Sequence, residues 1–256
     1  MRCSVEFFAA SPGHSTPRAD PVLVFDLDGT VLRTNSFPIW VLILASRGVA
    51  LCGQVMRLVI ARKRGRIDHE ELLRRMQALW VQHARPRDER RLQSLLMWQV
   101  RRNLRSILKC CADGKWDAVL ATAAAADYAE SLGHRLGLRH VLATPSGRGS
   151  KELSNSGERK RLKVYEWLRE RGWQARPLIF FNDDMADLPL MREARIVFWF
   201  GSRRMIETAR RQTTARLIAC RGKSEQEMHT TLAQIYNCVI AERLNDRLRS
   251  RMRTAA

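Results

Sequence analysis

The chain of 256 residues is predicted to be an α/β protein, a three-layer α/β/α sandwich around a parallel sheet, with helices inserted after the first strand. Two observations predict this class. Short apolar runs that end in polar turns recur at three places, as buried parallel strands do. Asp28 and Thr122, which follow the first two of these runs, lie 94 positions apart, too far for one strand-helix-strand crossover, so the insertion is placed between them.

The first strand is predicted over residues 22–25, Val-Leu-Val-Phe, and Asp26-Leu27-Asp28-Gly29-Thr30 follows it directly. Ligands of open α/β sheets bind at the carboxyl ends of the strands. We therefore expect the carboxylates of Asp26 and Asp28 at the mouth of a binding site. The alternative is a strand that merely ends in a polar turn.

The second strand, residues 119–121, ends in Thr122, and the small residues 123–126 are interpreted as the start of a helix that continues through Leu132. Such a junction offers a hydroxyl and free backbone N–H groups to an anion, which is what a phosphate needs. Thr122 and Ala123 are therefore candidate phosphate-binding residues.

A later helix is predicted after Ser154-Asn155-Ser156-Gly157, with Lys160 on its first turn, placed to reach inward. Lys163 is the alternative candidate for this inward-reaching lysine, although a solvated position on the protein surface explains it more simply. Four apolar residues of this helix are expected in the core: Leu162, Val164, Trp167 and Leu168.

The third strand, residues 178–181, ends in another acidic cluster that contains Asp183, Asp184 and Asp187. Asp187 is interpreted as a metal ligand or as a partner of Lys160. An N-cap is the alternative for Asp187, because Leu188-Pro189 follows it and proline is favoured early in a helix.

The order of these segments, DxDGT, then Thr, then Lys, then a strand ending in DDxxD, resembles the four motifs of the haloacid-dehalogenase-like (HAD) hydrolases over roughly residues 21–201. The resemblance is to the phosphoserine-phosphatase-like members, subfamily IB, which have a helical C1 cap. It implies a Rossmann-like core, phosphohydrolase activity and Mg²⁺ as cofactor. The departures are Asn182, where the family most often has glycine before Asp183, and the extra acid Asp184, which could replace Asp187 at the metal.

Carried over motif by motif, the resemblance implies a role for each candidate residue. Asp26 would be the nucleophile and Asp28 the general acid/base. The phosphate-binding residues would be Thr122, Ala123 and Lys160, and the metal site would comprise Asp26, Asp28 through its backbone carbonyl, Asp183 and Asp187. These roles fit phosphoryl transfer, in which an anionic nucleophile approaches only when cations and fixed donors neutralise the charge on the phosphoryl oxygens.

The domain organisation follows from the early insertion. A catalytic core is predicted over residues 21–35 and 117–222, a helical cap over 36–116, a disordered leader over 1–20 and a C-terminal helix over 223–256. In the cap, residues 37–60 are apolar but broken at Arg47, before the length of about 20 residues that a membrane span needs. Asp68 is predicted to cap a second helix that runs towards Val81.

A third cap helix is predicted after Pro86, with an apolar side and a basic, solvated side. The apolar side consists of Leu92, Leu95, Leu96, Val100, Leu104, Ile107 and Leu108, and the basic side of Arg101, Arg102, Arg105 and Lys109. In the C-terminal helix, one apolar face is predicted from Leu232, Ile235, Tyr236 and Ile240.

Basic residues are concentrated in the cap of this chain, whose formal net charge is +19: residues 36–116 contain 17 Arg or Lys against 6 Asp or Glu. A basic cap attracts anionic substrates and is compatible with peripheral contact to an anionic membrane. No nucleic-acid-binding motif is present, so nucleic acid is not expected as a partner. The six cysteines lack CxxC spacing, which indicates a reducing, cytoplasmic location rather than zinc or a disulfide framework.

Three functions stay open at this point. The first is a Mg²⁺-dependent phosphatase that acts through an aspartyl-phosphate on a phosphorylated small molecule or a lipid-linked sugar phosphate. The second is a phosphotransferase of the same fold, and the third is a non-catalytic basic binding module. Phosphoserine is disfavoured, because Thr34-Asn35 and Thr122-Ala123-Ala124 replace residues usual in phosphoserine phosphatases. The sequence after Asp28 is more similar to phosphatase domains joined to polyprenyl transferases. The sequence does not determine the oligomeric state.

Overall fold

The computed structural model describes residues 20–145 and 154–254, so most of the predicted leader over residues 1–20 lies outside the described residues. A parallel sheet of six strands forms the centre of the molecule, in the order β3-β2-β1-β4-β5-β6. The strands are β1 (Val22–Phe25), β2 (Ala118–Ala125), β3 (Val141–Thr144), β4 (Leu178–Asn182), β5 (Ile196–Trp199) and β6 (Arg216–Ala219).

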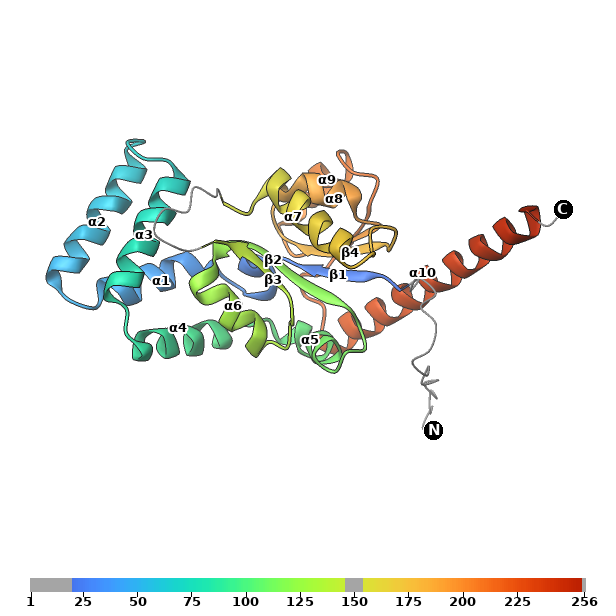
Figure 1. Cartoon of the computed structure of the whole chain (residues 1–256), viewed down its shortest axis with the longest axis horizontal. Coiled ribbons are helices and arrows are strands. Elements are labelled where there is room, and N and C mark those ends of the chain that lie inside the picture. Colours follow the sequence, from blue (N-terminus) through green and yellow to red (C-terminus); the bar gives the residue numbers. More distant parts are fainter. Residues whose placement is uncertain (1–19, 146–153, 255–256) are drawn as a thin grey trace.

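Helices cover both faces of the sheet, because alternate residues of each strand point to opposite sides. One face is covered by α7 (Gly157–Glu170), α8 (Leu188–Glu193) and α9 (Arg203–Arg210), and the other by α5 (Arg105–Ala112), α6 (Ala126–Arg135) and α10 (Glu225–Thr254). Val22 and Val24 of β1 pack in the core on the first of these faces, whereas Leu23 and Phe25 pack in the core on the second. Figure 1 shows these layers, which confirm the predicted three-layer α/β fold.

Four helices follow β1 and extend to one end of the molecule (Figure 1). We call them the cap helices: α1 (Ser36–Ala45), α2 (Val49–Lys63), α3 (His69–His83) and α4 (Pro86–Gln99). Asp68 caps α3 as predicted, accepting a hydrogen bond from the Glu71 N–H. The exact division of the chain into core and cap stays a prediction, and α5, which that division assigns to the cap, packs against α10.

The prediction of a single long helix after Pro86 is wrong. The chain leaves α4 at Gln99 and continues through a short 3₁₀ turn, η2 (Arg102–Leu104), into α5. The break occurs because the backbone at Val100 pairs in antiparallel fashion with Leu32, just beyond the first motif. The predictions that Leu95 lies on the apolar side of this helix and Leu162 in the core are also wrong, because the exposed fraction is 40% for Leu95 and 52% for Leu162.

The helix start predicted directly after Thr122 is also wrong, because β2 continues to Ala125 and α6 begins at Ala126. The extra residues stay in the sheet since Ala125 pairs with Thr144 of β3, past a shift in register, and the Ala123 carbonyl accepts a hydrogen bond from the Thr144 hydroxyl. The C-terminal helix is confirmed: Leu232, Ile235 and Tyr236 are buried on one face of α10, and Ile240 packs at the edge of the core. No described helix has the length and apolar character needed to cross a bilayer.

Candidate active site

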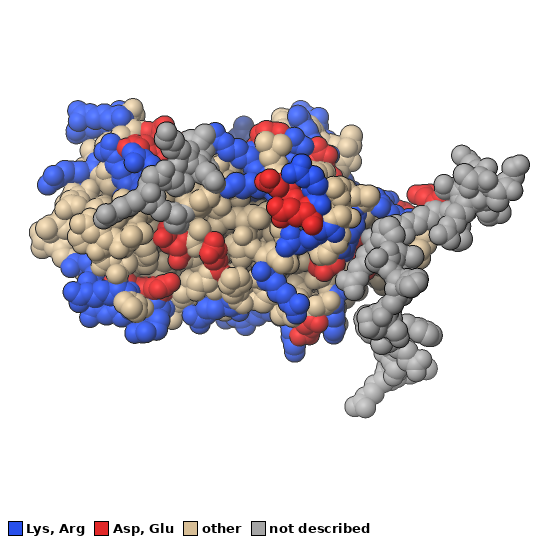
Figure 2. Space-filling view, viewed as in Figure 1, with Lys and Arg blue, Asp and Glu red and all other residues tan. Residues whose placement is uncertain are grey.

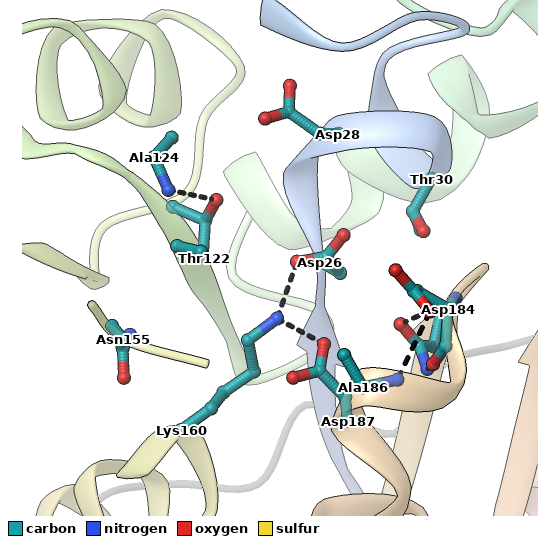
Figure 3. A network of polar contacts seen from close by, with 12 residues as sticks. Asp26, Asp28, Thr30, Thr122, Ala124, Asn155, Lys160, Asp184, Ala186 and Asp187 are labelled. Carbon is teal, nitrogen blue, oxygen red and sulfur yellow. Dashed lines mark hydrogen bonds and ion pairs between the residues drawn. The ribbon is translucent and has the colours of Figure 1, made fainter. Parts of the chain in front are cut away.

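Asp26 and Lys160 meet at the carboxyl end of β1. Asp26 directly follows this central strand, and Lys160 lies on the first turn of α7, where its side chain is buried. The Lys160 Nζ donates a hydrogen bond of 2.6 Å to Asp26 Oδ1 and also contacts Asp187 Oδ2, as Figure 3 shows. The structure therefore brings together residues that lie 134 positions apart in the sequence, as the motifs predicted.

The buried ammonium of Lys160 is held in its charged form by two carboxylates. Burial alone would lower the pKa of Lys160, but Asp26 and Asp187 outweigh it and raise that pKa above its usual value. Asp187 Oδ1 also accepts a hydrogen bond of 3.0 Å from the N–H of Gly157, the first residue of α7. Asp187 thus fixes both the helix that carries Lys160 and the Lys160 side chain, while making no side-chain cap for its own helix α8.

Asp183, after β4, packs against the turn η1 (Leu27–Val31) that follows Asp26. Its Oδ1 accepts a hydrogen bond of 3.2 Å from the Thr30 hydroxyl. Gly29 permits this approach, because its φ is +73° and an added Cβ would lie only 1.9 Å from Asp183 Oδ2. Burial is the main cause that raises the pKa of Asp183 to about 6 and that of Asp26 to about 7.

Arg101 supports the same turn, and it directly follows Val100, where the predicted helix breaks. Its Nη2 donates to the Gly29 carbonyl at 2.7 Å and its Nε to the Thr30 carbonyl at 2.9 Å, while the guanidinium lies over the Phe200 ring. The prediction of a solvated face for Arg101 is therefore wrong. Sequence reasoning missed it because a helical pattern placed it opposite the apolar residues, and only the break at Val100 turns it inward.

The carboxylate of Asp28 lies on the cap side of the site and points away from Asp26 and Lys160 in Figure 3. It accepts hydrogen bonds from the Ser36 N–H at 2.7 Å and the Ser36 hydroxyl at 3.1 Å. The Ser36 hydroxyl is also 2.7 Å from the Tyr128 hydroxyl. Burial raises the pKa of Asp28, and the hydrogen bonds from Ser36 oppose that rise. Neither Ser36 nor Tyr128 was predicted, since no motif marks them.

Thr122, a predicted phosphate-binding residue of β2, lies on the other side of the Lys160 ammonium from Asp187 in Figure 3. Thr122 is buried and its Oγ1 accepts a hydrogen bond of 3.1 Å from the Ala124 N–H, which leaves the hydroxyl proton to donate (Figure 3). Ala123 lines the cavity above the site. Asn155, which precedes α7, is fully buried and donates to the Leu142 carbonyl at 2.7 Å, so it anchors the segment that carries Lys160.

A cavity of about 510 Å³ opens over these groups and reaches the cap helices. Asp26, Lys160 and the acids after β4 line one part of it, and the exposed Asp184 is among them. Phe37 of α1 and His69 and Leu73 of α3 line the other part, together with Arg33 and Tyr128. Lys163 does not line this cavity.

The site offers hard oxygen donors and an excess of negative charge. Five carboxylates line the cavity, those of Asp26, Asp28, Asp183, Asp184 and Asp187, against two Lys or Arg side chains among its described lining residues, Lys160 and Arg33. Among the described residues, no group of three or more His, Cys, Asp or Glu side chains is arranged to hold a metal ion. Both carboxylate oxygens of Asp28 accept hydrogen bonds from Ser36, and those of Asp187 bind Lys160 and the Gly157 N–H. In the hydrogen bonds of the described residues, Asp26 and Asp183 each use one carboxylate oxygen and keep the other for a cation. Two such carboxylates fit the few protein ligands typical of Mg²⁺.

The sequence model of the haloacid dehalogenase-like hydrolases matches residues 23–192, the segment that runs from β1 through α8. The chain belongs to this family. The prediction of a HAD-like hydrolase is thereby confirmed, whereas a search of curated protein sequences gave no match.

Solved structures share the fold at low sequence identity. A protein of unknown function from Bordetella pertussis Tohama I is 19% identical with a TM-score of 0.64, over 79% of this chain and 99% of that one. A probable phosphoserine phosphatase from Vibrio cholerae is 13% identical with a TM-score of 0.55, over 77% of this chain and 60% of that one. A substrate-bound phosphoserine phosphatase is 10% identical with a TM-score of 0.53, over 84% and 99% of the two chains.

Proposed function

We propose that this HAD-family hydrolase is a Mg²⁺-dependent phosphatase that cleaves a phosphomonoester through an aspartyl-phosphate on Asp26. The observation that carries the proposal is the buried Lys160, whose ammonium lies 2.6 Å from Asp26 at the floor of the cavity. A buried cation beside a strand-end carboxylate is suited to bring a phosphoryl group and a nucleophile together.

In the first step, an Asp26 carboxylate oxygen attacks phosphorus and the bond from phosphorus to the ester oxygen breaks. Lys160 and the Thr122 hydroxyl offset the charge on the phosphoryl oxygens. Asp28 gives its proton to the departing alkoxide, a role supported by its raised pKa and by its position on the cap side of the cavity, where the leaving group must extend.

In the second step, Asp28 accepts a proton from water while the water oxygen attacks phosphorus. The bond between phosphorus and Asp26 then breaks, inorganic phosphate leaves, and Asp28 is again protonated. This double use of one carboxyl group explains why a second aspartate two positions after the nucleophile is useful.

Asp26, Asp183 and the backbone carbonyl of Asp28 are proposed to hold Mg²⁺, which would neutralise phosphoryl charge and orient the transferred group. Asp187 is proposed to position Lys160 rather than to bind the ion, because its carboxylate is already bound to Lys160 and to the Gly157 N–H. Gly29 and Thr30 hold Asp183 against the turn that presents Asp26.

The cavity supports a phosphorylated small molecule as substrate, since its 510 Å³ falls within the range of about 300–1,000 Å³ that is typical of small-molecule sites. The leaving group would contact the apolar rings of Phe37 and Tyr128, with Arg33 and His69 available to polar substituents.

Phosphate release from an aryl phosphate, with and without Mg²⁺, tests the proposal. Asp26→Asn should abolish turnover, whereas Asp184→Asn, the matched change at the exposed neighbouring acid, should retain most of it. Turnover that survives in Asp26→Asn would refute the assignment. If added alcohols receive the phosphoryl group in preference to water, the protein is a phosphotransferase instead.

A further inference from the structure

The cap helix α2 exposes a stripe of apolar side chains. Val49, Met56 and Ile60, together with Gly53, follow a spacing of four, three and four residues, which places them on one side of the helix. The exposed fractions are 91% for Val49, 48% for Met56 and 41% for Ile60. Leu51 and Val55, on the opposite side, are buried against the other cap helices.

Basic residues surround this apolar stripe. Residues 36–67 contain no Asp or Glu and six Arg or Lys. Arg47 alone of the six forms an ion pair, with Asp88, among the described side chains. The other five are exposed: Arg57, Arg62, Lys63, Arg64 and Arg66. Figure 2 shows the result at the end of the molecule where α2 lies, with uncharged side chains bordered by Lys and Arg.

We propose that α2 docks the protein on the surface of an anionic membrane. The apolar stripe would enter the boundary between headgroups and acyl chains, and the five free basic side chains would contact the anionic headgroups. A second copy of the chain is a poor occupant, because a two-fold interface would set the same basic residues of both copies against each other. The inference does not depend on the proposed phosphatase activity.

Binding should depend on both properties of α2. Each basic residue lost should weaken binding to anionic vesicles about fivefold, the factor that corresponds to about 1 kcal/mol per charge near the surface. Replacing the three exposed apolar side chains should weaken binding by at least about tenfold, because their burial in the interface is lost.

Co-sedimentation of the full chain with vesicles tests the proposal. The vesicles are phosphatidylcholine alone or phosphatidylcholine with about one third phosphatidylglycerol, at low and high salt. One variant combines V49S, M56S and I60S, and another combines K63Q and R64Q. The matched controls are L162Q with M205Q, and R203Q with R204Q, which change exposed residues of α7 and α9.

We expect the wild-type chain to bind the anionic vesicles, more weakly at high salt and far less to neutral ones. Both α2 variants should lose binding by the stated factors while both controls bind as the wild type does. Equal binding of the α2 variants and the controls, or no binding by the wild type, overturns the proposal. A dimer in light scattering that V49S/M56S/I60S dissociates also overturns it, because a second copy would then cover the stripe.

Discussion

Replacing Lys160 with methionine should destabilise the metal-free protein by about 3–5 kcal/mol at pH 8, because it leaves two buried carboxylates without their cation. The side chain of Lys160 is only 2% exposed, so water cannot replace the ammonium beside Asp26 and Asp187. Methionine has a similar length and fills the same volume, so little of this loss would come from an empty cavity.

The loss should shrink at lower pH. Burial already raises the pKa of Asp26 to about 7 with Lys160 present, and removing the lysine raises it further. A group whose pKa is higher in the folded state than in the unfolded state favours folding at low pH, and this contribution disappears as the pH rises through the folded value. Each pH unit changes the free energy of protonation by about 1.4 kcal/mol, so Asp26 of the variant gains at most about 3.4 kcal/mol between pH 8 and pH 5.5. Asp26 of the wild-type chain, with a pKa of about 7, gains about 2 kcal/mol over the same range, so the penalty should fall by up to about 1.4 kcal/mol.

Urea unfolding of the wild-type chain and of Lys160→Met at both pH values measures these differences. Arg169→Met, which removes one partner of an exposed ion pair on the same helix, is the control and should cost under about 1 kcal/mol. Asp187→Asn combined with Lys160→Met should cost less than the sum of the single changes, by about 1–3 kcal/mol. A loss for Lys160→Met that is below about 1 kcal/mol, or that does not change with pH, would refute the reasoning.

Three further predictions concern the groups around Asp26. Ser36→Ala should move the pH optimum of turnover upward, because Asp28 loses a hydrogen bond that favours its charged form; steady-state pH profiles measure the shift. Gly29→Ala should lower Mg²⁺ affinity by about 10–100-fold in titration calorimetry, since the new Cβ displaces Asp183. The rise in unfolding temperature caused by Mg²⁺ should grow from pH 5 to pH 8, because protons compete for Asp26 and Asp183, whose pKa values are about 7 and about 6.

The first two of these have a control within the chain. Ser36→Thr keeps the hydroxyl and should keep the optimum, while an unchanged or lowered optimum in Ser36→Ala contradicts the role of that hydrogen bond. Gly172→Ala tests backbone strain alone, because Gly172 has a φ of +66° but no neighbouring atom within 4 Å of an added Cβ; equal effects at both glycines would contradict the argument from Asp183. A Mg²⁺ effect that is constant with pH would contradict metal binding by these carboxylates.

The parts of the site that the sequence predicts are those in which a residue directly follows a buried strand or begins a helix. Asp26 and Asp183 follow apolar strands, and the parallel sheet brings the ends of these strands to one edge. Lys160 was predictable because its place on the first turn of α7 points it inward, and its burial among acids agrees with that interpretation.

The supporting residues could not be predicted, because they depend on contacts between distant segments. Arg101 reaches Gly29 only because Val100 leaves the helix to pair with Leu32. Tyr128 meets Ser36 across 92 positions of sequence, through the packing of α6 on the cap. The end of β2 was misplaced since alanines suit helices and strands alike in a short window, and only the pairing of Ala125 with Thr144 decides between them.

Identification of the phosphorylated residue tests the central claim most directly. The Asp28→Asn variant, which keeps the nucleophile but lacks the group that activates water, is mixed with an aryl phosphate and Mg²⁺, quenched in acid and analysed by peptide mass spectrometry. We predict one phosphoryl group on Asp26, absent when Asp26 is replaced by asparagine in the same background. A phosphoryl group on another residue, or release of phosphate with no phosphorylated protein at any time, would contradict an aspartyl-phosphate mechanism at this site.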